Sequence, residues 1–238
     1  MRSSALENAI LKLNKEVSVE LADTPAARRE AFALRYQVYC IERNYEPGYN
    51  GIEQDGYDDS AVHAVARWRQ TGKVIGTVRL ILPNDPPGND DFPMQRICDP
   101  GVLDGLPRNT IGEVSRFALA KWMTQQMRRT SADTAPILRL ALIRGAVWLS
   151  AEVGHTHWVA MMEHTLLRVL RATGIHFVPL GAAVDYHGLR QPAVAELVPT
   201  MARLAREQPV MWEYITRSGT WYSAPAKRHH TVPEGTAT

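Results

Sequence analysis

Cysteine is scarce in this chain, which has only Cys40 and Cys98 among its 238 residues. Two cysteines cannot form the disulfide framework of a small secreted domain, so we expect a reducing, cytoplasmic environment. No stretch reaches the roughly 18 apolar residues of a transmembrane helix, and residues 1–15 lack the apolar segment of a signal peptide. The sequence therefore predicts a soluble protein without a transmembrane segment.

A strong charge of one sign is also absent. The chain has 27 Lys and Arg against 25 Asp and Glu, a formal net charge of +2. Nucleic-acid-binding domains concentrate basic residues in a stripe or patch, so we exclude nucleic acid as a partner. Hydrophobic residues make up 45% and charged residues 22%, as in ordinary globular domains. We expect one domain over residues 1–219 and a flexible C-terminal tail at 220–238.

The order of secondary-structure elements indicates the fold class. Alternating or short apolar runs predict strands, and apolar residues at helical spacing predict helices. We expect strands at 17–21, 62–69, 74–82, 111–120, 157–162 and 176–180. We expect helices at 25–41, 136–153, 163–173 and from 199 to about 219, with long loops at 42–60 and 83–109 and an irregular stretch at 184–197. Hairpin strands followed by a strand-helix-strand half predict an α/β fold, a mixed sheet with helices on both faces.

Charged residues gather in three short blocks, at 53–59 in the first long loop, at Arg79 in the second hairpin strand, and at 113–117 in the next strand. Charges inside apolar strands cost free energy unless they are paired or face a cleft. Each block alone also fits a solvated turn or a structural ion pair, so the prediction of a site depends on all three together. The residues that can neutralise one another are Arg79 and Arg116 on one side and Glu53, Asp55, Asp58 and Glu113 on the other. Such a cluster suits a zwitterionic acceptor, with carboxylates on its ammonium group and an arginine on its carboxylate.

The spacing of charges within the third block, residues 113–117, bears on the shape of the strand. Glu113 and Arg116 are three residues apart and lie on opposite faces of a regular strand, whereas a bulge brings both to one side. The order of elements resembles that of GNAT-type N-acyltransferases, which splay this central strand and free a backbone N–H to polarise a thioester carbonyl. The resemblance implies that Glu53 or Glu113 takes the proton from the attacking ammonium, and the sequence leaves open which.

Four motifs, at residues 35–39, 53–58, 76–80 and 113–117, resemble those of the acyl-homoserine-lactone autoinducer synthases. In that family these motifs shape the active site. The resemblance implies catalytic roles for Glu53, Glu113, Ser115 and Arg116. It implies substrate contacts for Arg35, Tyr39, Asp55, Asp58, Arg79 and Phe117.

A sister group, the N-acyl amino acid synthases and PEP-CTERM/exosortase-associated acyltransferases, is closer still. Its features are present at Val38–Glu42, at Leu80–Pro83 and at Asp185–Pro192, and the chain has Arg43-Asn44-Tyr45 where the autoinducer synthases usually carry a tryptophan. Members of this group acylate an amino acid, such as tyrosine, from acyl-carrier protein and make no lactone. The resemblance thus implies an N-acyl amino acid product. A homoserine-lactone synthase that uses S-adenosylmethionine is the alternative.

The donor is indicated by a missing motif. GNAT enzymes usually carry a Gly-x-Gly coenzyme A loop after the bulged strand, but this chain continues from Phe117 as Ala118-Leu119-Ala120-Lys121-Trp122. This favours the acyl-phosphopantetheine of acyl-carrier protein as donor, with no tightly bound cofactor. Acyl-carrier protein is acidic, and basic residues available to meet it, if they are not simply solubilising charges, are Lys121, Arg128, Arg129, Arg139 and Arg144.

Other readings of the sequence are weaker. A non-catalytic sensor of acyl-carrier protein would keep the basic residues but would not need the acidic loop. His155 and His157 lack the further ligands that a zinc site needs, so we expect no metal. The apolar segment 166–170, with Trp148, Met161 and Met162, fits the core by default, and a long acyl chain needs an apolar slot that some of these residues would line.

Overall fold

The computed structural model describes residues 2–130 and 134–222, and a mixed sheet runs through this part of the chain. The strand order is β1-β2-β3-β4-β5-β8-β6, with β7 paired to β8. The pair β4–β5 is parallel, and the other pairs are antiparallel. The strands are β1 Val17–Leu21, β2 Ala61–Trp68, β3 Lys73–Ile81, β4 Ile111–Leu119, β5 His157–Met162, β6 Val178–Pro179, β7 Val184–Asp185 and β8 Leu189–Glu196.

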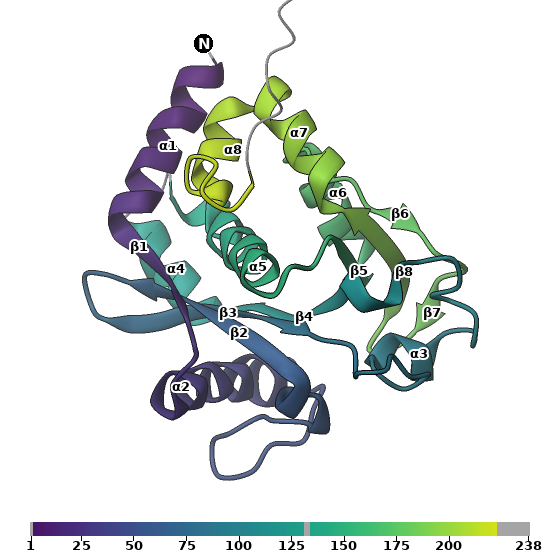
Figure 1. Cartoon of the computed structure of the whole chain (residues 1–238). Coiled ribbons are helices and arrows are strands. Elements are labelled where there is room, and N and C mark those ends of the chain that lie inside the picture. Colours follow the sequence, from purple (N-terminus) through teal and green to yellow (C-terminus); the bar gives the residue numbers. More distant parts are fainter. Residues whose placement is uncertain (1, 131–133, 223–238) are drawn as a thin grey trace, which may run out of the picture.

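Helices cover both faces of this sheet, as the sequence predicts. Helix α2 lies on one face, while α1, α5 and α8 lie on the other (Figure 1). The helices are α1 Arg2–Glu16, α2 Pro25–Arg35, α3 Pro93–Ile97, α4 Lys121–Thr130, α5 Arg139–Val153, α6 His164–Ala172, α7 Leu197–Glu207 and α8 Pro209–Thr216. Across residues 2–130 and 134–222, none of these helices is long and apolar enough to cross a membrane.

Helix α2 begins as the sequence predicts. The hydroxyl of Thr24 accepts a hydrogen bond from the Ala27 amide at 3.2 Å, and Pro25 occupies the first turn. The expected helix to residue 41 changes its character at Tyr36, because Tyr36–Glu42 forms a π-helix. π-helical turns are rare and often occur at functional sites, and Tyr39 of this one is half-buried and packs against the main core.

The largest core lies between the sheet and α5. Gly145 allows the close approach, because a Cβ on it would lie 3.0 Å from the Ala64 Cβ and 3.1 Å from a Val78 methyl group. Trp221 and Tyr222, which the sequence assigned to the tail, pack with this domain: Trp221 stacks on Trp148, and the Tyr222 hydroxyl donates to the His155 carbonyl at 3.1 Å. Residues 223–238 of the expected tail lie outside the described part of the chain.

Several elements differ from the sequence expectation. Strand β8 lies within the stretch 184–197 that we expected to be irregular, and it pairs with β5 along its length even though it contains Pro192. Helix α4 follows β4 directly, where no element was expected. The loop 83–109 also contains the short helix α3, which lies next to the site described below.

Candidate active site

The parallel strands β4 and β5 separate in the middle of the sheet. They pair only from Ile111 to Glu113, opposite His157 to Val159. Beyond that point β4 bulges: Arg79 of β3 faces Ser115, but Thr77 faces Ala118, so β4 has one extra residue. Arg116 lies in the bulge with a φ of 49°, a conformation that non-glycine residues rarely adopt. The predicted bulge is present and begins just after Ser115.

Buried ion pairs connect the bulge of β4 to the acidic loop, residues 53–59, and to helix α2. Arg35, at the end of α2, is 0% exposed. Its Nε donates to Glu53, and its two terminal nitrogens donate to the two oxygens of Asp58 at 2.7 and 3.0 Å. Asp58 also accepts the Asp55 amide at 2.8 Å, which closes a capping box at the start of a short 3₁₀-helix, Gly56–Ser60.

Arg79 makes the second set of contacts from β3. It is also 0% exposed, and it donates to both oxygens of Asp55 at 2.6 and 3.1 Å and to Asp58 at 2.8 Å. Its Nε donates to the Ser115 hydroxyl at 2.9 Å. Arg79 therefore fixes the acidic loop against the bulged strand.

Arg116 makes the third set from the bulge itself. Its Nε and one terminal nitrogen donate to Glu53 at 2.8 to 3.2 Å, and the same terminal nitrogen donates to Asp55 at 2.9 Å. The guanidinium also lies 5.2 Å from the centre of the Tyr39 ring. Because the left-handed backbone aims the side chain at Glu53, these bonds explain how the strained conformation is held.

The buried part of the ion-pair network has as many guanidinium groups as carboxylates, and a fourth carboxylate, that of the less buried Glu46, lies 3.5 Å from Arg116. Three guanidinium groups, from Arg35, Arg79 and Arg116, meet three carboxylates, from Glu53, Asp55 and Asp58. Burial opposes ionisation of these carboxyl groups, but the arginines outweigh it and lower the pKa of all three.

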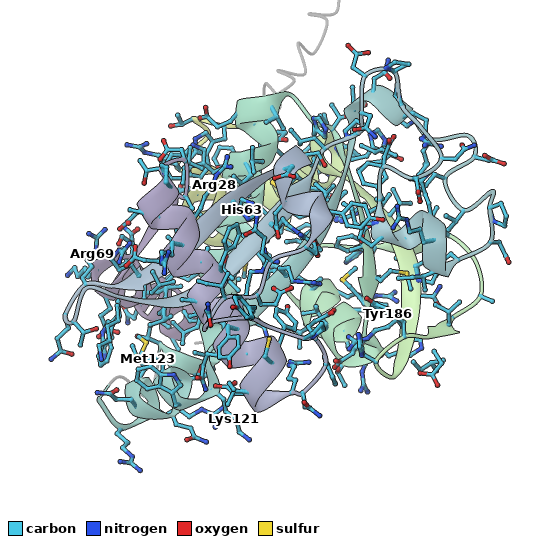
Figure 2. The ribbon with its side chains drawn as sticks, turned by 90° about the horizontal axis from the view of Figure 1, so that it is seen from below. Arg28, His63, Arg69, Lys121, Met123 and Tyr186 are labelled. Atoms are coloured by element: carbon cyan, nitrogen blue, oxygen red, sulfur yellow. The ribbon has the colours of Figure 1, made fainter. Side chains whose placement is uncertain are left out.

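His63, labelled in Figure 2, lies beside this network on β2. Its Nε2 is 3.7 Å from Asp58, and neither ring nitrogen has a hydrogen-bond partner among residues 2–130 and 134–222. Burial lowers the pKa of His63 to about 4, so the ring is neutral near pH 7.

Glu113 stands apart from the network. It is 3% exposed, and its carboxylate accepts one hydrogen bond, from the Met94 amide at the start of α3, at 3.0 Å. Burial raises the pKa of Glu113 to about 7, although that hydrogen bond and the more distant Arg79 and Arg116 act in the opposite direction. A carboxyl group with this pKa exchanges protons readily at neutral pH, as a general acid or base must.

A cleft of about 810 Å³ opens along the gap between β4 and β5. One part is polar and carries the groups of the bulge and the acidic loop, namely Tyr39, Asp55, Arg79, Glu113, Ser115, Arg116 and Phe117. The other part is apolar and runs between the sheet and helices α5 and α6, lined by Leu119, Ile143, Ala146, Trp158, Ala160, Met162, Leu166, Val169, Leu170 and Phe177. The shape suits a molecule with a reactive polar end and a long apolar chain.

The mouth of the cleft is formed by two loops that meet. The chain after the π-helix supplies Arg43, Tyr45 and Glu46, and the β7–β8 turn supplies Tyr186 and His187. The rings of Tyr45 and His187 stack at 4.8 Å, and His187 lies 3.6 Å from Glu46. Tyr186 is visible beside β8 in Figure 2.

The structure brings most of the predicted site residues together. Seven of them line the cleft, whereas Arg35, Glu53 and Asp58 lie behind this lining as partners in the ion-pair network. The predicted carrier-docking residues are more dispersed. Lys121, Arg128 and Arg129 are exposed on α4, and Arg139 is exposed beside the apolar part of the cleft. Arg144 is occupied elsewhere, because it donates to Asn14 and lies 5.0 Å from the Tyr214 ring.

Several cleft residues were not singled out from the sequence: Arg43, Tyr45, Glu46, Tyr57, Trp158, Glu163, Phe177, His187 and Arg190. Two of them, His187 and Arg190, belong to the segment Asp185–Pro192, which was already noticed in the sequence. His187 and Gly188 form a tight turn there, with φ values of 52° and 92°. That segment carried the family resemblance, but it was not assigned to the site.

The architecture identifies the fold. The chain has the GNAT fold, an α/β architecture with one parallel pair at the point where the central strands separate. Residues 34–130, under half of the chain, match the family model described as acetyltransferase (GNAT) domain. No curated protein matches the sequence.

Solved structures that are similar to this chain include an acyl-homoserine lactone synthase and an N-acyl amino acid synthase. BjaI, a CoA-dependent acyl-homoserine lactone synthase, is 20% identical with a TM-score of 0.60, over 90% of this chain and 95% of BjaI. TofI, solved with an inhibitor and MTA, is 23% identical with a TM-score of 0.58, over 82% of this chain and 99% of TofI. FeeM, an N-acyl amino acid synthase from uncultured soil microbes, is 13% identical with a TM-score of 0.51, over 77% of this chain and 91% of FeeM.

Proposed function

We propose that the protein is an N-acyltransferase that moves a long fatty acyl group from the phosphopantetheine thioester of acyl-carrier protein to the amine of an amino acid. The observation that carries this proposal is the position of Glu113. It is a buried carboxyl group with a pKa of about 7, at the point where β4 and β5 separate, and it lines a cleft that continues into an apolar slot.

Glu113 acts as the general base in this proposal. The amine nitrogen attacks the thioester carbonyl carbon and forms the new C–N bond, the C–S bond breaks, and the thiol leaves. The acceptor's ammonium group first loses one proton to solvent. Glu113, directly or through a water molecule, takes the second proton, which the nitrogen loses as the C–N bond forms, and passes it on to the leaving thiolate. In the described part of the chain, the edge of β4 beyond Glu113 faces the gap without a strand partner on that side, so its backbone amides can stabilise the oxyanion.

The sequence left open whether Glu53 or Glu113 is the general base, and we assign Glu53 a different role. It is 2% exposed, and Arg35 and Arg116 hold it as an ionised partner with a lowered pKa. A carboxylate so strongly stabilised in its charged form is a poor base. We assign Glu53 to positioning Arg116 and the bulge, and Asp55, which lines the cleft, to contact with the acceptor's ammonium group.

A contact at the start of α4 supports a carrier-borne donor over free coenzyme A. The N-terminus of a helix is a common site for phosphate groups. Here both carboxylate oxygens of Glu42 accept the amide of Lys121, at 3.1 and 3.2 Å. An internal anion thus already occupies the first turn of α4, which disfavours a diphosphate at that place.

Product analysis tests the proposal. The purified protein is incubated with palmitoyl-acyl-carrier protein and each of the common amino acids, or with S-adenosylmethionine, and products are identified by mass spectrometry. An N-acyl amino acid with release of the carrier thiol supports the proposal, and an acyl-homoserine lactone would replace it with the lactone-synthase alternative. Tight binding of the acyl-carrier without consumption of the thioester would instead indicate a sensor.

A further inference from the structure

The arginines that line the cleft differ in how completely they are neutralised. Arg79 and Arg116 are saturated by the buried carboxylates, and Arg96 forms a one-to-one pair with Asp90 through two hydrogen bonds of 2.5 and 2.6 Å. At the mouth, by contrast, Arg43 and Arg190 share the single carboxylate of Glu163, at 3.5 and 2.9 Å from the same oxygen. Within this group of three side chains, two guanidinium groups and one carboxylate carry a charge of +1, whereas the carboxylate of Glu46, also at the mouth, lies toward Arg116 and His187, at 3.5 and 3.6 Å.

This group of three residues is accessible and partly preorganised. Arg190 is fixed, because its Nε and one terminal nitrogen donate to the carbonyls of Tyr186 and His187 at 3.2 and 3.1 Å. The side chain of Arg43 is 45% exposed and that of Glu163 is 42% exposed. Guanidinium groups recognise phosphate oxygens through charge-assisted hydrogen bonds, and an incoming anion can take the place of Glu163 on one or both of them.

The position of Glu163 along β5 distinguishes between two anions. Glu113 lies opposite Val159, and Glu163 is four residues further along the chain, which at about 3.3 Å per residue is about 13 Å. The carboxylate of an amino acid is only two bonds from its amine, so it covers only a small part of that span while the amine is at Glu113. The phosphate at the far end of a pantetheine arm can reach them when the thioester is in the gap.

We infer that Arg43 and Arg190, held together by Glu163, bind the phosphate group of the donor's phosphopantetheine arm at the mouth of the cleft. The inference rests on the proposed function for the identity of the donor. Phosphate recognition is thus assigned to Arg43, which follows the π-helix, and to Arg190 of β8, and not to the arginines of the buried network.

The test uses free 4′-phosphopantetheine and pantetheine, which differ only by the phosphate, and measures their binding by calorimetry. The wild-type protein is expected to bind the phosphorylated compound at least tenfold more tightly. Arg43→Gln should remove most of that preference and leave pantetheine binding unchanged, and Glu163→Gln should increase the preference by freeing both arginines. Arg67→Gln is the matched control, because Arg67 also contacts two carboxylates, Glu20 and Glu30, but lies away from the cleft.

Two results would overturn the inference: equal affinity of the wild-type protein for the two compounds, or equal weakening of both by Arg43→Gln. Arg190→Gln is a secondary variant, because that residue also supports the β7–β8 turn. The binding measurement does not depend on turnover. An Arg43-dependent phosphate preference in a protein without acyl transfer would therefore uphold this site and reject the proposed function.

Discussion

Glu53 and Glu113 are buried to nearly the same degree, 2% and 3% exposed, yet their pKa values move in opposite directions. Burial disfavours the charged form of both. Direct ion pairs with Arg35 and Arg116 offset the burial of Glu53, whereas within the described residues Glu113 accepts a hydrogen bond only from the Met94 amide. The same side chain therefore serves as a fixed anion in one place and as a proton acceptor in the other.

Replacement of the proposed base should remove the chemistry and keep the fold. We expect Glu113→Gln to lower kcat by about 10²- to 10⁴-fold, the usual contribution of general base catalysis. The wild-type kcat/KM should rise with pH through about 7 as Glu113 loses its proton, and this limb should be absent from the variant. Steady-state rates from pH 5.5 to 9 measure both effects. A variant with wild-type turnover would exclude Glu113 as the base.

The same residue should make stability depend on pH. Its pKa is about 7 in the folded protein and near the ordinary 4.5 in the unfolded chain, so the folded state binds the proton more tightly. Stability from this group is complete below pH 4.5 and is lost as pH rises through 7, by roughly 3 kcal/mol in all. Urea unfolding of the wild-type protein and of Glu113→Gln at several pH values should show that the variant loses less free energy of unfolding as the pH rises. Parallel pH curves for the two proteins would contradict this.

The buried network should be sensitive to the loss of one partner. Asp58→Asn leaves Arg35 and Arg79 with one carboxylate fewer, in a place where both are 0% exposed. Breaking a buried ion pair from one side destabilises by about 3–5 kcal/mol. Chemical denaturation measures the change. The control is Asp90→Asn, which breaks the exposed pair with Arg96 and is expected to leave the unfolding midpoint nearly unchanged.

The apolar part of the cleft should determine the acyl length. Ala146 of α5 and Ala160 of β5 line this part with small side chains. A phenylalanine at position 146 should fill the slot, so that Ala146→Phe accepts short acyl donors and loses long ones. Competition between octanoyl- and palmitoyl-acyl-carrier protein measures the ratio, and the octanoyl rate controls for folding. An unchanged ratio would place the acyl chain elsewhere.

The elements that depend on local pattern were predictable from the sequence. The hairpin β2–β3 and strand β5 follow from alternating or apolar runs, and the start of α2 follows from Thr24 and Pro25. Strand β8 was missed because Gly188 and Pro192 are typical of turns and strand ends. Pro192 is accommodated because it pairs with Met161 and its carbonyl accepts the Leu180 amide.

The site was predictable as a set of residues but not as a set of roles. Opposite charges in separate blocks indicated that Arg79 and Arg116 would meet Glu53, Asp55 and Asp58, and they do. The sequence placed Glu113 in the same group, because nothing local shows that its carboxylate accepts the Met94 amide of α3 and lies farther from the arginines than Glu53 does. The role of a carboxyl group depends on such long-range contacts, which spacing along the chain does not contain.

The central claim is that a thioester is opened by an amine at the gap between β4 and β5. The most direct measurement is single-turnover transfer from palmitoyl-acyl-carrier protein, with free thiol and N-acyl amino acid quantified together. The account predicts equal amounts of both with the wild-type protein and neither with Glu113→Gln. Thiol release without an acylated amine, or transfer that is unaffected by this substitution, would contradict it.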